Sequence, residues 1–205
     1  MSFLRKIVCA IVFLLQTSQS LETTFDHYVF TRLWDGEGQQ FTIHGLWPNY
    51  RTNGYPSYCG NQTLNMTSLT SIQDELMDRW PSYDGRNQDF WKHEWTKHGT
   101  CAMGASYIKS QLSYFSTTMW LDMRLSNLNV EIQHYLQNSS FPNSEPRTIS
   151  SGFFKPFATM PYCVFSDKKQ YLNEVRSNVD KTLQFIEPVF PEESGQCQPT
   201  QQIYL

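Results

Sequence analysis

The chain has 205 residues, of which 40% are hydrophobic and 17% are charged, a composition typical of a globular protein with an apolar core and not of a disordered or fibrous chain. Its formal net charge at pH 7 is −3, which argues against a broad cationic surface that holds a long nucleic-acid duplex. A polyanionic ligand would therefore have to be bound locally.

An export signal is the first predicted element in chain order. Arg5 and Lys6 precede an apolar run over residues 7–15, and small residues follow at positions 18 and 20, which is the pattern of a secretory signal peptide. The run is too short to span a bilayer. We expect residues 1–20 to be removed and residues 21–205 to form one secreted or lumenal domain without membrane attachment. Loss of two basic residues takes its formal charge from −3 to −5.

Strands and helices follow in separate groups. Aromatic and β-branched residues predict strands over 25–34 and 41–44, with a mostly irregular segment over 45–65. Apolar residues at helical spacing predict helices over 69–80, 88–98, 108–123 and 128–136, with Pro81 and Gly99 ending the first two. Short apolar runs at 162–165, 171–179 and 182–186 predict antiparallel strands. This order predicts an α+β fold in which several helices pack on a central antiparallel sheet.

Cysteine usage agrees with export. The mature chain would keep Cys59, Cys101, Cys163 and Cys197. Four cysteines in an exported protein favour two disulfides, for which three pairings are open. Zinc is the weaker interpretation because the spacings are long and no Cys-x-x-Cys pair occurs, so we expect no metal site. Sequons at Asn61, Asn65 and Asn138 predict exposed glycosylation sites.

The densest cluster of reactive side chains is FWKHEWTKHGTC, residues 90–101. On an ideal helix its polar face, together with one phenylalanine, spans an arc of about 140°; these residues are His93, Lys97, Phe90, Glu94 and His98. The face could be an ordinary solvated one with i,i+4 neighbours. Two histidines next to tryptophans that can pack inward favour a functional face instead.

A third histidine suggests a reaction type. His44 ends a predicted strand in FTIHGLWPNY, residues 41–50, where Gly45 permits a turn and Trp47 offers a flat apolar wall. Two imidazoles on either side of a substrate are suited to concerted general acid–base catalysis. Spacing alone leaves open whether His44 faces His98.

These two segments closely resemble the active-site segments of the ribonuclease T2 family. Members of this family are secreted endoribonucleases of the transferase type. The two segments match almost letter for letter, and a looser likeness to plant S-like members runs over most of the mature chain, including FDHYVFTRLW at residues 25–34. The resemblance implies cleavage of single-stranded RNA to 2′,3′-cyclic phosphates and then to 3′-phosphates, with low base specificity. It also implies a monomer that needs no cofactor and leaves DNA intact, because the 2′-OH is the nucleophile.

The resemblance also assigns roles to residues. His44 matches the general acid and His98 the general base, while Glu94 and Lys97 match residues that assist at phosphorus. Substrate binding is implied for His93, Trp47, Asn49 and Phe90. The implied disulfides are Cys59–Cys101 and Cys163–Cys197.

The chain departs from the family pattern in two places. Plant members usually have a longer, cysteine-containing loop where this chain has only residues 35–40, and many relatives have a base-contacting glutamine where this chain has Val29. His27 and His134 match no catalytic position, so we assign them to structure or surface. The alternative function is a catalytically impaired T2-like protein with a binding or storage role. The acidic balance argues against a pollen-rejecting S-ribonuclease, and the lack of a partner motif for Glu94 argues against a glycosidase.

Overall fold

The structure is a computed structural model, which describes residues 24–52, 54–139, 146–187 and 195–205. The predicted signal peptide, residues 1–20, lies outside these ranges. The described residues form a mixed sheet with the strand order β2-β1-β5-β7-β3, and β4 and β6 also pair with β5. The strands are β1 (His27–Asp35), β2 (Gln40–Asn49), β3 (Thr148–Ile149), β4 (Met160–Ser166), β5 (Lys169–Val179), β6 (Phe185–Ile186) and β7 (Ile203–Tyr204).

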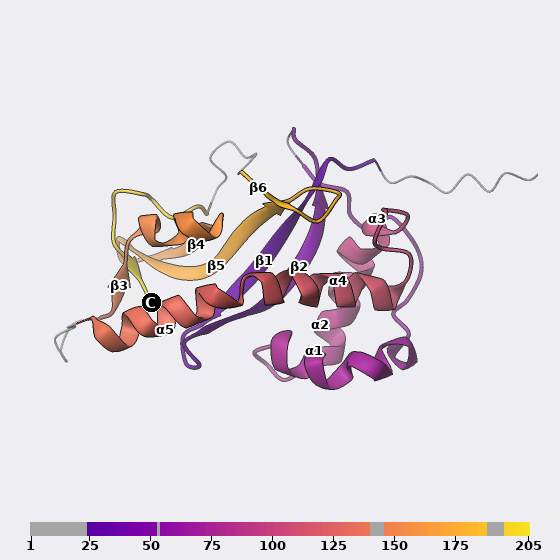
Figure 1. Ribbon diagram of the computed structural model, residues 1–205, viewed down its shortest axis with the longest axis horizontal. Helices are drawn as coiled ribbons and strands as arrows, with labels where there is room; N and C mark the ends of the chain where they lie inside the picture. The colour runs from indigo at the N-terminus through magenta and orange to yellow at the C-terminus, as the bar shows by residue number, and fades with distance from the viewer. Residues whose placement is uncertain (1–23, 53, 140–145, 188–194) are drawn as a thin grey trace, which may run out of the picture.

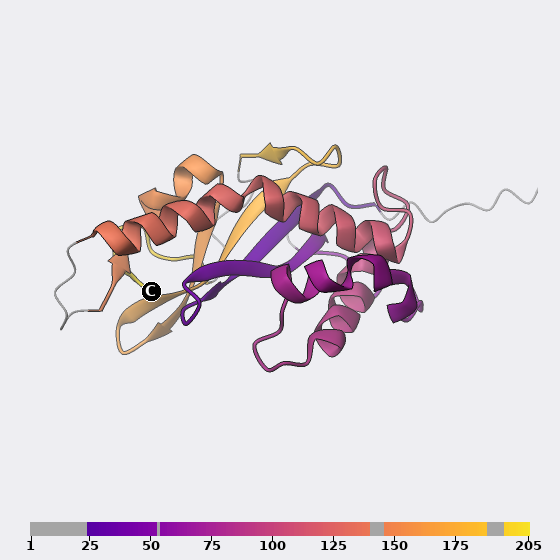
Figure 2. The same ribbon diagram turned by 60° about the horizontal axis from the view of Figure 1, so that its bottom comes forward.

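Helices cover one face and one end of this sheet. Figures 1 and 2 show α4 and α5 end to end along one side of the sheet, with α1 and α2 gathered near one end of it. The α-helices are α1 (Gln73–Arg79), α2 (Asn87–Glu94), α3 (Thr100–Ala102), α4 (Gln111–Arg124) and α5 (Ser126–Asn138). Two 3-10 helices, η1 (Met66–Ile72) and η3 (Ser151–Phe157), and one π-helical turn, η2 (Trp95–Gly99), complete the described helical elements. The predicted α+β class is confirmed.

The sheet departs from the expected antiparallel pattern at one pairing. The strand pairs of the described chain are antiparallel except for β5 with β7, which are parallel. Strands β3 and β7 are two residues long, so they give no alternating pattern in the sequence. The run at 182–186 forms a strand only at β6, because residues 180–184 make a turn in which the Asp180 side chain accepts backbone hydrogen bonds from Thr182 and Gln184.

Several predicted boundaries change. Strand β2 continues through residues 45–49, which were expected to be irregular. The helix predicted over 69–80 begins as the 3-10 helix η1 and ends at Arg79, two residues before Pro81. Gly99 does not end its helix, which continues into α3. A side chain at position 99 would collide with the Trp95 ring, so this glycine is required for close packing.

The helical stripes pack on the sheet as a core. Tyr114, Phe115 and Leu121 of α4 are fully buried, as are Leu128 and Ile132 of α5. Two apolar residues of the stripe over 108–123 are exposed and do not join this core; these are Leu112 and Met123. Burial of one broad face of α4 and α5 holds this helical layer against the sheet.

Two disulfides and a short hairpin link segments of the described chain. The implied pairs Cys59–Cys101 and Cys163–Cys197 are both present. The shortened segment 35–40 closes β1 and β2 as a hairpin, in which Trp34 pairs with Phe41 and Asp35 with Gln40. The short connection is therefore compatible with regular pairing of the strand that carries His44. Within the described ranges, no helix is long and apolar enough to cross a membrane.

Candidate active site

A β-bulge in β2 sets the direction of His44. The register of the β1–β2 pairing skips this residue, since successive residues of β1 pair with Gly45 and Ile43. A bulge changes which face the neighbouring side chains occupy. Ile43 and Leu46 are consequently both buried in the core. His44 and Trp47 lie together on the other face, with ring centroids 4.9 Å apart.

The indole of Trp47 lies between the two histidines. His98 stacks on this indole with a centroid distance of 5.1 Å and an interplanar angle of 27°, while His44 meets it edge-on. The indole Nε1 also donates a hydrogen bond of 2.9 Å to Oε2 of Glu94. The structure thus brings His44, Glu94 and His98 together around one tryptophan, although they come from two separate segments.

Close approach of the two segments requires a glycine at position 45. A Cβ atom at this position would collide with the carboxylate of Glu94 and the indole of Trp47. Next to this glycine, Nε1 of Trp80 donates a hydrogen bond of 2.9 Å to the carbonyl of His44. The strand that carries His44 is therefore held by close packing at Gly45 and by the hydrogen bond from Trp80.

The π-turn redirects the second segment. A π-turn adds one residue to a helical turn, so the ideal arc predicted for residues 90–98 does not hold beyond Glu94. Glu94 is 1% and His98 3% exposed, whereas His93 is exposed and Lys97 is half-buried. The two side chains at one edge of the predicted arc are therefore the buried ones. The expected inward packing is confirmed for Trp91 and Trp95, both fully buried.

Burial gives the two inner side chains unusual acidities. Burial raises the pKa of Glu94 to about 7. The charges of His44 and Lys97 and the hydrogen bond from Trp47 oppose this shift. Burial and the charges of Lys97 and His93 lower the pKa of His98 to about 3. Burial and Lys97 also lower the pKa of His93. A neutral imidazole and a weakly acidic carboxyl group can therefore coexist at mildly acidic pH.

Lys97 lies at the open side of this cluster. Its ammonium group is 5.8 Å from the ring centroid of Tyr55, and its carbonyl accepts a hydrogen bond of 3.0 Å from the amide of Tyr58. The Cys59–Cys101 disulfide joins the same two segments. The loop after β2 is in this way attached to the helix that carries His98.

Two charged residues at the site were missed in the sequence. Glu174 and Arg176 lie on β5, and Oε2 of Glu174 is 3.0 Å from Nδ1 of His44. The other carboxylate oxygen of Glu174 accepts hydrogen bonds from Arg176. Opposite charges two residues apart in an apolar strand were an available signal, because a buried charge in a strand needs a partner. Their proximity to His44 could not be inferred without the sheet order.

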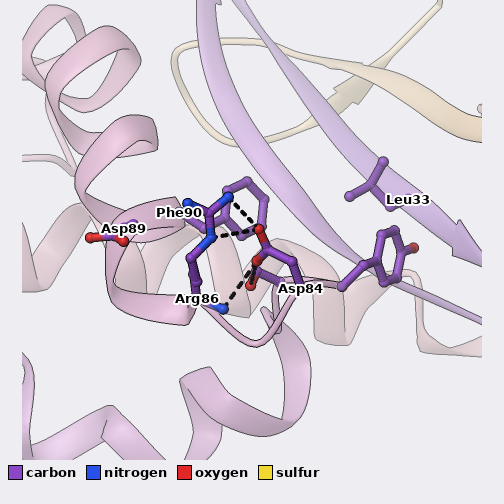
Figure 3. A pocket seen from close by; sticks show the side chains of 7 residues that line it. Leu33, Asp84, Arg86, Asp89 and Phe90 are labelled. Atoms are coloured by element: carbon purple, nitrogen blue, oxygen red, sulfur yellow. Dashed lines mark hydrogen bonds and ion pairs between the residues drawn. The ribbon is translucent and has the colours of Figure 1, made fainter.

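A cavity is connected to the site through Phe90, one of its lining residues. It has a volume of about 460 Å³. Its lining residues are Leu33, Ser82, Tyr83, Asp84, Arg86, Asp89 and Phe90. Figure 3 shows the Asp84–Arg86 ion pair next to Phe90, with Leu33 farther away on a strand. The Phe90 ring is also 5.8 Å from His44, so this cavity adjoins the His44 side of the site.

The other predicted residues lie as follows. Asn49 ends β2, and its side-chain oxygen accepts a hydrogen bond from the amide of Tyr50. Val29 is buried and pairs with Trp47 across β1 and β2. His27 is buried and His134 is exposed on α5, as assigned.

The sequons and metal ligands can also be placed. The glycosylation residues Asn61, Asn65 and Asn138 are all exposed. Clusters of three or more metal-ligating side chains are absent from the described ranges.

Comparison with known proteins gives a consistent result. The profile of the Ribonuclease T2 family matches residues 14–197. Intracellular ribonuclease LX of Solanum lycopersicum is 31% identical over 176 residues, which cover 78% of this chain and 68% of that protein. Ribonuclease DdI of Dictyostelium discoideum is 38% identical over 105 residues, which cover 45% of this chain and 47% of the relative. The matches to ribonuclease DdI and to two further curated relatives cover between 30% and 56% of the length of those proteins.

A solved structure has the same fold. Ribonuclease MC1 from the seeds of bitter gourd matches with a TM-score of 0.64 and 29% identity, covering 80% of this chain and 94% of that one. A mutant of that ribonuclease has been solved in complex with 5′-GMP and matches with a TM-score of 0.65.

Proposed function

The chain belongs to the ribonuclease T2 family, and from this premise we propose that it is a secreted endoribonuclease that cleaves single-stranded RNA through its own 2′-hydroxyl group. The observation that carries this proposal is the placement of His44 and His98 against the same Trp47 indole. An internal nucleophile already lies beside phosphorus in RNA, so the enzyme gains most by orienting the attack and moving two protons. This chemistry requires no metal ion and leaves DNA intact.

The two histidines would act on opposite sides of the phosphorus. His98 takes the proton of the 2′-OH as the 2′-oxygen–phosphorus bond forms, and His44 gives a proton to the 5′-oxygen as the phosphorus–oxygen bond breaks. A lowered pKa keeps His98 neutral and able to accept a proton at mildly acidic pH. An incoming phosphate anion would raise this pKa and so make His98 a stronger base. The cyclic phosphate is then hydrolysed to a 3′-phosphate with the two roles exchanged.

Glu94 and Lys97 would support the charge at phosphorus. A carboxyl group with a pKa of about 7 is largely uncharged at mildly acidic pH, so it does not repel the phosphate. Lys97 supplies a positive charge for the nonbridging oxygens, and the exposed His93 lies beside it for phosphate binding. Glu94 also holds Trp47 by a hydrogen bond, and in this way it acts on the ring that His98 stacks against.

The cavity would receive the nucleoside of the leaving group. His44 protonates the leaving 5′-oxygen, and Phe90 connects His44 to the cavity. The nucleoside attached to that oxygen therefore has a space of about 460 Å³ next to it. Trp47 and Asn49 remain the proposed contacts for the other base.

Export and processing complete the proposal. The signal pattern of residues 1–20, two disulfides and three exposed sequon asparagines support a glycosylated protein of the secretory route. We propose that it acts as a monomer. Expression of the full chain with N-terminal sequencing and glycosidase treatment of the exported protein tests this part, and retention of residues 1–20 on a cytosolic protein would contradict it.

A dinucleotide assay tests the activity. Purified protein should convert CpU to cytidine 2′,3′-cyclic phosphate and uridine with EDTA present, and His44→Ala and His98→Ala should each lower kcat/KM by at least ~100-fold. His134→Ala is the matched control, because this histidine is exposed on α5. An inactive wild-type protein at mildly acidic pH would favour the binding or storage alternative. Full activity in either site variant would refute the assigned role.

A further inference from the structure

Strand β5 contributes an ion pair to the site, and it lies outside the two segments that resemble the family, residues 41–50 and 90–101. Residues two apart in a strand lie on the same face, which places Glu174 and Arg176 side by side. Their partners in β1 are Leu33 and Thr31, and Thr31 pairs in turn with Gly45 of β2. The pair therefore lies two strands away from the bulge that directs His44.

Both oxygens of Glu174 have a specific partner. Oε2 is 3.0 Å from Nδ1 of His44. Oε1 accepts hydrogen bonds from Arg176, at 2.7 Å from Nε and 2.6 Å from Nη2. Burial alone would raise the pKa of Glu174, but the hydrogen bond with His44 and the charge of Arg176 outweigh burial and lower it. The carboxylate is therefore ionised under the conditions in which His44 would act.

This contact fixes the orientation of the His44 ring. An ionised carboxylate only accepts hydrogen bonds, so Nδ1 of His44 must carry a hydrogen and donate it to Glu174. The other ring nitrogen, Nε2, is then the one free to exchange a proton with substrate. The side chain of His44 is 28% exposed and that of Glu174 is 5% exposed, which agrees with an outward reactive edge and a shielded support.

We propose that Glu174 is a positioning residue for His44, which it holds as a proton donor to the leaving 5′-oxygen through Nε2. Arg176 keeps Glu174 in place and also lies over the Trp47 ring, 5.5 Å from its centroid. This inference rests on the proposed ribonuclease function. In the step concerned, the phosphorus–O5′ bond breaks, the Nε2 proton moves to O5′, and neutral His44 remains hydrogen-bonded to Glu174 through Nδ1.

Several charged groups surround His44, and among the described residues Glu174 is the carboxylate that is hydrogen-bonded to its ring. From α2 and η2, His44 interacts electrostatically with His93, Glu94 and His98. From β5 it interacts with Glu174, which Arg176 partly neutralises. Glu94 is mostly uncharged at mildly acidic pH. Removing the carboxylate of Glu174 therefore removes the only anionic oxygen among the described residues that is hydrogen-bonded to the His44 ring.

The experiment separates proton donation from general damage to the site by changing the leaving group. Cleavage of CpU expels the 5′-alkoxide of uridine, which needs a proton. Cleavage of uridine 3′-(4-nitrophenyl phosphate) expels 4-nitrophenolate, a weak base that needs little help from an acid. Glu174→Gln should lower kcat/KM on CpU by about 10-fold and Glu174→Ala by about 100-fold, with less than ~3-fold loss on the aryl ester. Glu75→Gln, at an exposed ion pair with Arg79, is the control and should leave both rates unchanged.

A second measurement does not depend on activity. The ¹⁵N chemical shifts of the His44 ring report which nitrogen carries hydrogen, and wild-type protein should show the Nδ1–H form in a hydrogen bond. Glu174→Ala should lose that signature, while near-ultraviolet circular dichroism shows that the fold is kept. If Glu174→Ala does not fold, the isosteric Glu174→Gln carries the test.

The outcomes discriminate between explanations. Equal losses on the two substrates would overturn the positioning role, because they indicate general damage to the site. Unchanged CpU cleavage in Glu174→Gln, or an unchanged ring tautomer in Glu174→Ala, would also overturn it. If wild-type protein cleaves neither substrate, the proposed function itself is wrong and the positioning role falls with it.

Discussion

The surroundings of His44 and His98 differ although the two rings touch the same tryptophan. His44 lies in strand β2, and its Nδ1 is hydrogen-bonded to the ionised Glu174. His98 stands on the π-turn, and its buried Nδ1 has no hydrogen-bond partner in the described part of the chain. The ionised carboxylate fixes the orientation of the His44 ring, whereas burial and the charge of Lys97 lower the pKa of His98.

The contrast suggests how one residue type can serve as both acid and base. Enzymes that need both functions place chemically equal groups in environments that separate their proton affinities. In this protein the sheet would supply the environment of the acid and the helical segment that of the base. Variants that disturb one environment, or the contact between them, test this division.

Gly45→Ala should have the largest effect, because it acts on both environments. The added Cβ would collide with Glu94 and Trp47, so we expect kcat/KM on CpU to fall by at least ~100-fold and the free energy of unfolding to fall by about 1–3 kcal/mol. Urea unfolding and the dinucleotide assay measure these effects. Gly152→Ala is the control, since its Cβ would make only an ordinary contact of 3.6 Å with Ser150. Equal behaviour of the two variants would refute the close approach of the segments.

Trp47→Phe should disturb mainly the His98 side. Phenylalanine keeps a ring for stacking but loses the Nε1 donor to Glu94, and a buried group without its partner costs about 1–3 kcal/mol of stability. We expect kcat/KM to fall about 10-fold, with a similar loss for CpU and the aryl ester. Trp120→Phe on the exposed surface of α4 is the matched control. A loss confined to CpU would contradict the separation of the two sides.

The two disulfides allow a comparison of position at similar loop length. Their sequence separations are 42 and 34 residues, so removing either pair by Cys→Ser substitution should cost about 2–4 kcal/mol in the free energy of unfolding. Only the Cys59–Cys101 pair adjoins the helix of His98, so only its loss should also raise KM, by a few-fold. A raised KM after loss of Cys163–Cys197 alone would show that this reasoning is wrong.

The smallest expected effect is on the pH dependence of stability. Glu94, with its pKa raised from 4.5 to about 7, contributes stability that is present below pH 4.5 and is lost as the pH rises through 7. His98, with its pKa lowered from 6.5 to about 3, contributes stability that is present above pH 6.5 and is lost as the pH falls through 3. The two slopes oppose each other between pH 4.5 and 6.5, so the stability of wild-type protein should be nearly flat there.

Glu94→Gln should reveal the pH dependence of stability that comes from His98. Its free energy of unfolding should rise between pH 4.5 and 6.5 by up to about 1.4 kcal/mol per pH unit, because only the contribution of His98 remains. Urea unfolding at several pH values measures this, with Glu131→Gln on the exposed side of α5 as the control. Parallel pH profiles for wild type and Glu94→Gln would indicate that Glu94 is not held protonated.

Local information in the sequence predicted most of the helices and strands and one of the two segments of the candidate site. The apolar runs at 25–34 and 171–179 became β1 and β5 because a half-buried strand selects aromatic and β-branched residues over its whole length. The segment at 90–101 allowed four site residues to be predicted together, because they are close neighbours in one helical segment; these are His93, Glu94, Lys97 and His98. The pairs Cys59–Cys101 and Cys163–Cys197 followed from family resemblance, since spacing left three pairings open.

The sequence by itself determined the family, the class of fold and the candidate residues of the site, since these depend on residues that lie close together in the chain. Only the tertiary structure decided how they meet. The bulge at His44, the π-turn before His98 and the approach of Glu174 from β5 arise from strand register and packing between distant segments. Such arrangements depend on the summed fit of many contacts, and no single stretch of sequence encodes that fit.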